Sequence, residues 1–282
     1  MFVVYIAQSA YLLKDMVSDQ TLWEWCYSGK SNTDTNVYNR LAEVIGNCFD
    51  CYDIYLQGSY RNSTSIDGNG DVDIVVECNG YYENAYISRH DLKHLRDDLF
   101  EAIQGYHNFR FEKGSKTIKY PGSYIYSPAD IVPCIPYDHM GNRGISIYDH
   151  RKHKVIHNYP KQHMENGTEK NKRTNQLFKK TVRVFKNARD YLVEHYKISG
   201  STAPSYFIEC MVYNVPDYQF VDDIPTTVRN VLRWLNSNFI QAIGFRCQNE
   251  ITYMFDVFDP DTGWDYSNFN KFLTALNDIV RP

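Results

Sequence analysis

Two aspartates separated by one apolar residue are the first feature of this sequence that could do chemistry. They stand in the run Asp71-Val72-Asp73-Ile74-Val75-Val76, which is typical of a buried strand. Alternate residues of a strand point to the same side, so Asp71 and Asp73 are predicted to face one space together. Like charges this close repel unless a cation lies between them, and Mg²⁺ prefers such hard oxygen ligands. Two solvated acids at an exposed strand end are the alternative, so the context must decide.

Two further features supply that context. Gly58 and Ser59 follow a predicted strand, and eleven residues separate them from Asp71. A glycine there lets backbone amides approach an anion, and a serine offers donors to phosphate oxygens. A third acid, Asp130, precedes the apolar pair Ile131-Val132 of a later predicted strand. Three carboxylates from adjacent strands could hold two metal ions that activate a hydroxyl and stabilise a pyrophosphate leaving group.

Hydrophobic periodicity predicts the elements that must position these residues. The first half alternates between helices and strands, and the chain reads as helical beyond about residue 159. We predict helices at 36–48, 89–104, 175–196, 204–213, 221–243 and 266–279, strands at 53–57, 71–77, 116–120 and 124–136, and turns over 61–70. This order predicts an α+β fold, with a mixed β-sheet and N-terminal helices in residues 1–158 and a helical bundle in residues 159–282.

Composition excludes several classes of protein. The 282 residues are 43% hydrophobic and 15% aromatic, which excludes a disordered or low-complexity chain. No apolar run approaches the length of a membrane span, and the first lysine, Lys14, comes too late for a secretory signal, so we expect a cytoplasmic protein without membrane contact. The seven cysteines are predicted to be reduced thiols, and Cys48-x-x-Cys51 lacks the second pair that a zinc site needs.

Several short motifs, taken in order, resemble a known group of enzymes. They are Gly58-Ser59-Tyr60-Arg61, the Asp71/Asp73 pair, Asp130-Ile131-Val132-Pro133 and Pro204-Ser205-Tyr206-Phe207-Ile208-Glu209. This set resembles the DNA polymerase beta-type nucleotidyltransferase superfamily and, within it, the cyclic GMP-AMP synthase/DncV-like nucleotidyltransferases (CD-NTases), relatives of the 2′-5′ oligoadenylate synthases. The resemblance runs from about Leu41 to Pro216. It implies a two-lobed fold with the active site in the cleft between the lobes.

The resemblance also implies roles for individual residues. Asp71, Asp73 and Asp130 would be the catalytic metal ligands for two Mg²⁺ ions, with Mn²⁺ possible and no organic cofactor, and Asp130 would be the general base. Gly58 and Ser59 would hold the donor triphosphate of a nucleoside triphosphate. Lys186 and Ser205 would bind the triphosphate tail.

The predicted helix 175–196 carries its own signal for such a role. Lys179, Arg183 and Lys186 form one basic stripe beside an apolar stripe on that helix. A salt-bridged surface lysine is the alternative for Lys186, with Arg183 or Lys179 as substitutes.

The function implied is template-independent nucleotidyl transfer. The product would be a cyclic or short linear oligonucleotide signal, made in bacterial antiphage defence and sensed by a separate effector. The alternative is transfer onto a macromolecular acceptor, an RNA 3′ end or a protein hydroxyl. The basic segment 151–189, with twelve Lys and Arg against two acids, keeps nucleic-acid contact open. A catalytically dead scaffold would not need three mutually repelling acids, and a phosphodiesterase would not need Gly58-Ser59.

Two clusters of ring side chains are weaker signals. His150, His153, His157 and His163 could suggest a metal site, but the lysines and arginine among them would repel a cation, so a loop or hairpin is favoured. Tyr124, Tyr126 and Tyr137 could stack on a nucleobase, although strand tyrosines more often pack within the protein.

Overall fold

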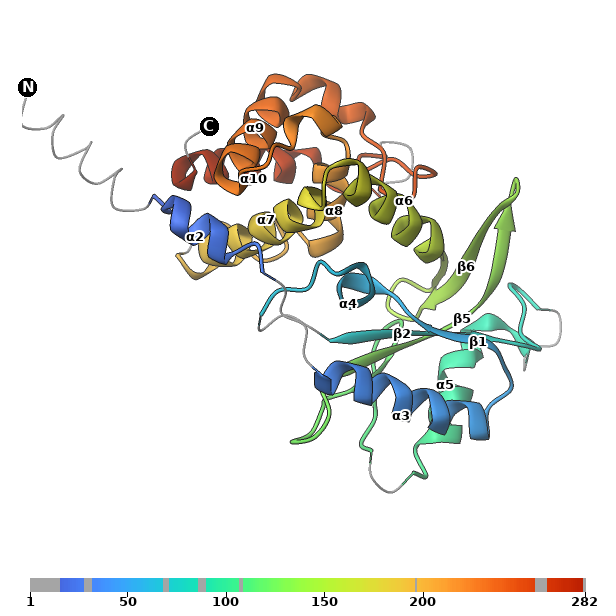
Figure 1. Cartoon of the computed structure of the whole chain (residues 1–282). Coiled ribbons are helices and arrows are strands. Elements are labelled where there is room, and N and C mark those ends of the chain that lie inside the picture. The colour runs from blue at the N-terminus through green and yellow to red at the C-terminus, as the bar shows by residue number, and fades with distance from the viewer. Residues whose placement is uncertain are drawn as a thin grey trace, which may run out of the picture. The chain divides into compact units, whose positions relative to one another are not determined.

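The chain folds into two compact units. The computed structural model describes residues 16–27, 32–67, 71–85, 90–106, 109–195, 197–256 and 263–280. Residues 29–164 form one unit, the sheet unit, and residues 165–282 together with 1–28 form the other, the helical unit (Figure 1). The division predicted at 158/159 falls just before helix α6 (Pro160–Arg173), whereas the compact units divide at 164/165, inside that helix.

Over its described residues, the sheet unit is built on seven strands. They are β1 (Cys51–Leu56), β2 (Val72–Cys78), β3 (Glu112–Lys113), β4 (Ile118–Tyr120), β5 (Ala129–His139), β6 (Asn142–Asp149) and β7 (Lys154–Asn158). The order is β1-β2-β5-β4-β3, and β6 pairs with both β5 and β7. Strand β2 runs parallel to β5, whereas the other pairs are antiparallel. The predicted mixed sheet is therefore confirmed.

Two helices cover one face of this sheet, as Figure 1 shows. Helix α3 (Asn32–Cys48) and helix α5 (Leu92–Ile103) share one hydrophobic core with β2 and β5. Helix α5 begins after Asp91, whose side chain accepts a hydrogen bond from the backbone N–H of Lys93. This cap satisfies an amide that would otherwise lack a partner in the first turn. The opposite face of the sheet is not covered by α3 or α5.

The helical unit packs around a largely aromatic and aliphatic core. Its elements are α2 (Asp19–Glu24), the later part of α6, α7 (Leu177–Glu194), α8 (Ser205–Tyr213), η2 (Asp217–Gln219), α9 (Ile224–Ser237), η3 (Ile240–Gly244) and α10 (Tyr266–Ile279). Helix α9 starts with Asp223 accepting from the Thr226 N–H and with Pro225 in its first turn. Proline is well tolerated there because that N–H has no partner within the helix. The predicted α+β class is thus confirmed.

Three predicted segments were wrong in detail. The segment predicted as turns contains the end of a short helix, α4 (Gly58–Asn62), while residues 68–70 lie outside the described residues. The strand predicted from Tyr124 begins only at Ala129, because the Ser123 hydroxyl accepts from the N–H groups of Ile125 and Tyr126 and holds a turn there. The helix predicted over 221–243 is divided into α9 and η3.

Candidate active site

The structure places two of the three predicted acids side by side on the sheet. Asp73 of β2 and Asp130 of β5 are direct partners in the register of the two parallel strands. On β2, Val72 and Ile74 point into the core beneath α3 and α5, so Asp73 points to the opposite face. Asp71 directly precedes β2 and is exposed. The sequence predicted one shared face for Asp71 and Asp73, and the strand register now adds the pairing of Asp73 with Asp130.

Gly58 lies directly against one of these acids. Its backbone has a φ of +67°, and a Cβ atom added to it would lie 1.9 Å from Asp73 Oδ2. No side chain fits that gap, and the left-handed conformation favours glycine as well. The backbone N–H of Gln57 also donates to the Asp73 carbonyl oxygen over 2.9 Å. The Gly58 turn and the acidic pair therefore form one local structure.

Ser59 occupies the first turn of α4, next to Gly58. Its carbonyl oxygen accepts from the Thr64 N–H at 2.9 Å, and the helix ends at Ser63 in a left-handed conformation. From the same helix, the Tyr60 hydroxyl is 2.7 Å from the hydroxyl of Thr35. These contacts fix the turn that carries Gly58 and Ser59 beside the acids.

Asp130 has an electrostatic environment that the sequence did not reveal. Burial raises the pKa of its carboxyl, the ammonium of Lys119 opposes the rise and the charge of Asp71 adds to it. Lys119 Nζ lies 3.6 Å from Asp130 Oδ1, and the two residues are register partners of β4 and β5. A weak signal was present in Ile118-Lys119-Tyr120, where one charge stands between two apolar residues.

The donor set of this site is chemically suited to a hard divalent cation. It consists of carboxylate oxygens held close to one another, which is the ligand type that Mg²⁺ and Mn²⁺ take in proteins. The rise in the pKa of Asp130 caused in part by Asp71 reflects repulsion that a cation would relieve. Within the described ranges, no group of three or more His, Cys, Asp or Glu side chains is already arranged to hold a metal ion.

Lys186 and Ser205, the two predicted triphosphate ligands of the helical unit, lie on α7 and α8. Lys186 is only 1% exposed, and its Nζ lies 2.6 Å from Oε1 of the equally buried Glu209. Ser205 is the first residue of α8 and is half-buried. Sequence reasoning missed the partner Glu209, although it stands one helical turn after Ser205.

The other members of the predicted basic stripe also contact groups of the helical unit. Arg183 Nε donates to the Cys26 carbonyl oxygen over 2.6 Å, and burial lowers the pKa of Arg183. Lys179 Nζ lies 3.4 Å from the Thr168 hydroxyl.

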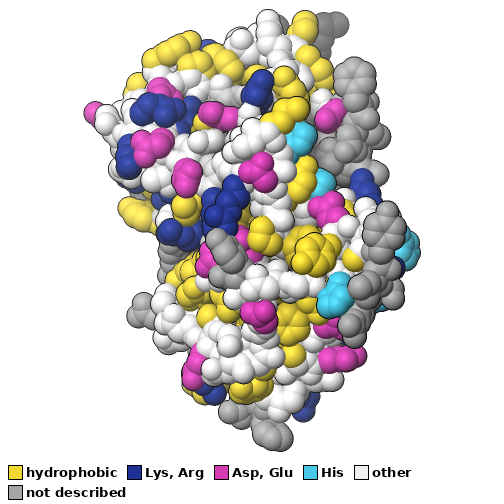
Figure 2. All heavy atoms as spheres, turned by 90° about the vertical axis from the view of Figure 1, so that its right-hand side faces the viewer, with side chains coloured by type: hydrophobic (Ala, Val, Ile, Leu, Met, Phe, Trp, Pro, Cys, Tyr) yellow, Lys and Arg dark blue, Asp and Glu magenta, His cyan; other side chains and the backbone are white. Residues whose placement is uncertain are grey.

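Many of the basic side chains in 151–189 also form ion pairs within the protein. The ion pairs of this segment include those of Lys161 with Asp53, Lys170 and Arg173 with Asp217, Lys172 with Glu169, and Arg189 with Asp190. Figure 2 shows basic and acidic side chains interspersed on one face of the molecule.

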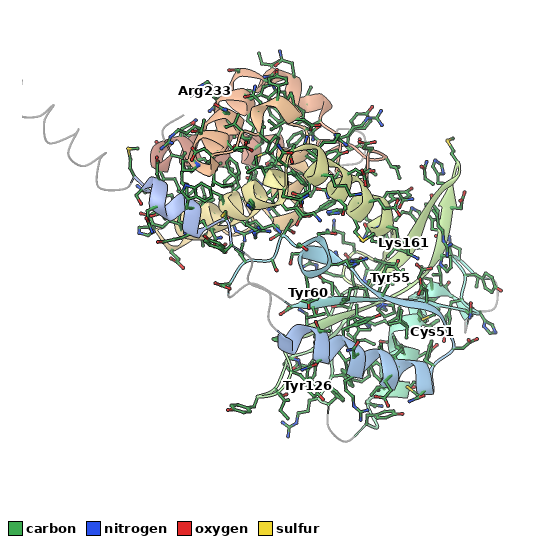
Figure 3. All side chains as sticks on the ribbon, in the orientation of Figure 1. Cys51, Tyr55, Tyr60, Tyr126, Lys161 and Arg233 are labelled. Atoms are coloured by element: carbon green, nitrogen blue, oxygen red, sulfur yellow. The ribbon has the colours of Figure 1, made fainter. Side chains whose placement is uncertain are left out.

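A second carboxylate cluster occupies the same sheet face, four residues further along β2. Glu77 is 2% exposed, and its Oε1 accepts from the Tyr55 hydroxyl at 2.7 Å. Lys161 Nζ lies 3.6 Å from that oxygen, 3.1 Å from Asp53 Oδ2 and 4.3 Å from the centre of the Tyr55 ring. Figure 3 shows Tyr55 on β1 beside Lys161 at the start of α6. Arg143 lies 3.7 Å from Glu77 Oε2. This cluster joins the first turn of α6, which belongs to the sheet unit, to the sheet.

The weaker sequence signals resolve as local structure. All seven cysteines are thiols. His150 and His153 lie around the turn of the β6–β7 hairpin, as predicted, while His157 pairs with Glu83 at 3.1 Å. Tyr126 packs on Phe109, and Tyr137 stacks on His157 with ring centres 3.8 Å apart.

In the described part of the chain, no helix is both long and apolar enough to cross a membrane.

Comparison with known proteins places this geometry in a family. Residues 165–281 match the C-terminal helical domain of cGAS/DncV-like nucleotidyltransferases. A cyclic UMP-AMP synthase of Rhodothermus marinus is 34% identical over 93% of this chain and 97% of its own length. A cyclic nucleotide synthase, CdnE01, of Staphylococcus haemolyticus is 34% identical over 90% of this chain and 95% of its own length.

Solved structures agree with these relatives. The Rhodothermus marinus c-UMP-AMP synthase, solved with Apcpp and Upnpp, has a TM-score of 0.80 at 32% identity and covers 93% of this chain and 96% of its own. The Elizabethkingia meningoseptica CdnE cyclic dinucleotide synthase, solved with GTP and Apcpp, has a TM-score of 0.82 at 28% identity and covers 93% and 98%. The fold and these relatives define the class as a nucleotidyltransferase. More closely, the chain belongs to the cGAS/DncV-like nucleotidyltransferase family, and the resemblance stated from its motifs is confirmed.

Proposed function

We propose that this enzyme joins two nucleoside triphosphates into a cyclic dinucleotide. A ribose hydroxyl of one nucleotide attacks the α-phosphorus of the other triphosphate, the bond to the bridging oxygen breaks, and pyrophosphate leaves. A second transfer in the opposite sense closes the ring and releases a second pyrophosphate. The observation that carries the proposal is the Asp73–Asp130 register pair with Gly58 packed against it.

The residues of the sheet unit have distinct tasks in this reaction. Asp130 takes the proton of the attacking hydroxyl, and burial raises the pKa of its carboxyl, which is the direction that makes it a stronger base. Gly58 and Ser59 hold the donor triphosphate through backbone N–H groups and the serine hydroxyl. Asp71, Asp73 and Asp130 would hold two Mg²⁺ ions, or Mn²⁺, which supply charge stabilisation at the phosphate. No organic cofactor enters the scheme.

The helical unit would contribute the contacts to the triphosphate tail. Ser205, at the first turn of α8, offers a hydroxyl and a backbone N–H at a helix start, where anions are favoured. Lys186 contributes only when nucleotide binding separates its ammonium from Glu209. Lys179, half-buried on the same helix, is the substitute. A larger change in KM for nucleotide with Lys179→Met than with Lys186→Met would favour the substitute.

The alternative, transfer onto a macromolecular acceptor, has less support. The relatives described above are named as makers of cyclic nucleotides, and many basic residues of 151–189 already have protein partners. The relatives differ in their named products, because one is a cyclic UMP-AMP synthase and another a cyclic dipurine nucleotide synthase. The bases used by this enzyme are therefore a matter for experiment. In a bacterial cell, the product would act on a separate effector protein in antiphage defence.

The test is product analysis by mass spectrometry. The purified full chain is incubated with the four ribonucleoside triphosphates, singly and in pairs, with Mg²⁺ or Mn²⁺, beside the matched variant Asp71→Asn/Asp73→Asn. We expect a low-mass cyclic dinucleotide that the double variant does not make. Label attached to the protein or to added RNA, and absent with the variant, would contradict the proposal and support the macromolecular acceptor.

A further inference from the structure

One basic residue stands beside the acids without a role in the reaction described above. Lys119 lies on the short strand β4, between Ile118 and Tyr120, which are both buried in the core beneath the helices. Alternation along the strand therefore turns Lys119 to the opposite face, the face of Asp73 and Asp130. Register brings the three together, because Asp130 pairs with Asp73 on one side and with Lys119 on the other.

The lysine side chain runs past the turn of Gly114. A Cβ atom added to Gly114 would lie 3.4 Å from Lys119 Cε, an ordinary van der Waals contact. The turn that carries Gly114 is held by its N–H, which donates to the Thr117 carbonyl oxygen at 2.8 Å, and by Arg96, which donates to the Gly114 carbonyl oxygen at 2.6 Å. The ammonium reaches to 3.6 Å from Asp130 Oδ1 while the lysine side chain stays 51% exposed.

An exposed ion pair normally contributes little, but this one has an unusual partner. The Asp130 side chain is only 21% exposed, so its charge is partly removed from water. It also stands beside Asp73 and within the field of Asp71. Without a metal ion, Lys119 is a cation at the site where negative charge accumulates. A divalent ion that binds Asp130 must take over the same carboxylate against the repulsion of this ammonium.

We propose that Lys119 is a built-in counter-cation, a positioning residue that holds the Asp130 carboxylate in the metal-free enzyme and competes with the divalent ion for it. The inference rests on the proposed function only in taking Asp130 as a metal ligand. The metal-free site is thereby kept stable, and metal binding is kept weaker than the acids alone would make it. Lys119 leaves Asp130 as the metal arrives, because its stem is flexible and half in solvent.

The test measures metal binding and stability directly, without the reaction. Wild type, Lys119→Met, Lys119→Arg and a control, Lys113→Met, are titrated with Mn²⁺ as the full chain, and unbound Mn²⁺ is counted by electron paramagnetic resonance. Lys113 is a fair control because it lies on the neighbouring strand β3 and pairs with Asp97 at 3.0 Å, away from the acids. We expect Lys119→Met to lower the Kd for Mn²⁺ by roughly threefold to tenfold. Lys119→Arg and Lys113→Met should leave the Kd close to that of wild type.

Thermal unfolding supplies the second readout. In a chelator, Lys119→Met should lower the melting temperature by about 2–4 °C, because Asp130 then lacks its counter-charge. Saturating Mn²⁺ should close that gap, since the metal replaces the lost ammonium. An unchanged Mn²⁺ Kd in Lys119→Met would overturn the inference, and so would a melting gap of equal size with and without Mn²⁺.

The two proposals fail in different ways. If wild type makes the cyclic product but Lys119→Met binds Mn²⁺ no more tightly, the role of Lys119 is wrong and the proposed function stands. If Mn²⁺ binds more tightly to Lys119→Met while no cyclic product forms with any nucleotide pair, the counter-cation role stands and the proposed reaction is wrong. If neither wild type nor Lys119→Met binds Mn²⁺, Asp130 is not a metal ligand and both are overturned.

Discussion

Strand β2 carries two carboxylates on one face, Asp73 near its start and Glu77 near its end, and their surroundings differ sharply. Glu77 is 2% exposed, accepts from the Tyr55 hydroxyl and lies near the cations of Lys161 and Arg143. Asp73 is half-buried and stands between a second acid and the backbone of Gly58. Glu77 accepts one hydrogen bond and lies near two cations, whereas Asp73 is placed beside a second carboxylate.

Under the proposed function, this difference separates a structural carboxylate, Glu77, from a catalytic one, Asp73. A buried carboxylate is tolerated when cations and hydrogen bonds compensate it, and removal of a partner then destabilises the fold. Two carboxylates at one site repel each other, and a metal ion can relieve that repulsion. Glu209 on α8 repeats the Glu77 pattern in the helical unit, with the buried Lys186 as its partner. The comparison therefore predicts stability losses at one kind of site and activity losses at the other.

The largest stability effect is expected at the Lys186–Glu209 pair. Lys186→Met should lower the free energy of unfolding by about 3–5 kcal/mol, because it leaves the Glu209 carboxylate buried without its cation. Chemical denaturation measures this loss. The double variant Lys186→Met/Glu209→Gln should recover part of it. A loss below about 1 kcal/mol would contradict the view that the Lys186–Glu209 pair stabilises the fold.

Gly58→Ala should damage both stability and activity. The left-handed backbone and the contact with Asp73 should cost about 1–3 kcal/mol, and displacement of Asp73 should lower turnover roughly tenfold to a hundredfold. Denaturation and initial rates measure the two effects. The matched control is Gly46→Ala within α3, where an added Cβ has nothing within 4 Å. That control should be neutral or slightly stabilising and fully active. Full activity in Gly58→Ala would contradict the assignment of this turn.

Glu77→Gln should cost stability but little activity. The amide keeps an acceptor for the Tyr55 hydroxyl but loses the charge that faces Lys161 and Arg143, so we expect a loss of about 1–3 kcal/mol. Turnover should stay within about twofold of wild type when it is assayed well below the melting temperature. A large fall in turnover of the folded variant would remove the distinction between the two ends of β2.

The smallest effect is expected at an exposed pair. Arg40 and Glu43 lie 2.7 Å apart on α3, but their side chains are 39% and 59% exposed. Glu43→Gln should change the free energy of unfolding by no more than about 0.5 kcal/mol, because water competes for both charges. Chemical denaturation of Glu43→Gln and Glu77→Gln under the same conditions compares the exposed ion pair with the buried one directly. An equal loss in both variants would show that burial does not set the size of the effect.

Local patterns predicted much of the sheet unit, but pairing between distant strands could not be read from them. The alternation around Asp73 predicted which residues enter the core, and the core beneath α3 and α5 confirms it. The partnership of Asp73 with Asp130 needs a parallel crossover between β2 and β5, which depends on contacts far apart in the sequence. The sequence did not predict that Lys119 lies beside Asp130 for the same reason, since only the β4–β5 register brings the two residues together.

In the helical unit, helical spacing identified the stripe on α7 but not its environment. The pattern of Lys179, Arg183 and Lys186 suggested a charged face open to an anion. Helix α7 is instead buried on most of its surface, and Lys186 meets Glu209 inside the unit. Periodicity reports which residues share a face of a helix, but it does not report what packs against that face.

The most direct measurement is one turnover assay on two matched carboxylate-to-amide variants of the same strand, Asp73→Asn and Glu77→Gln, with the nucleotide pair that wild type uses. Circular dichroism first establishes that both variants are folded at the assay temperature. We predict that Asp73→Asn lowers turnover by about 10³-fold, because a proposed metal ligand is lost, while Glu77→Gln keeps turnover within about twofold of wild type. Comparable turnover in the two variants would contradict the assignment of Asp73 to catalysis and of Glu77 to structure.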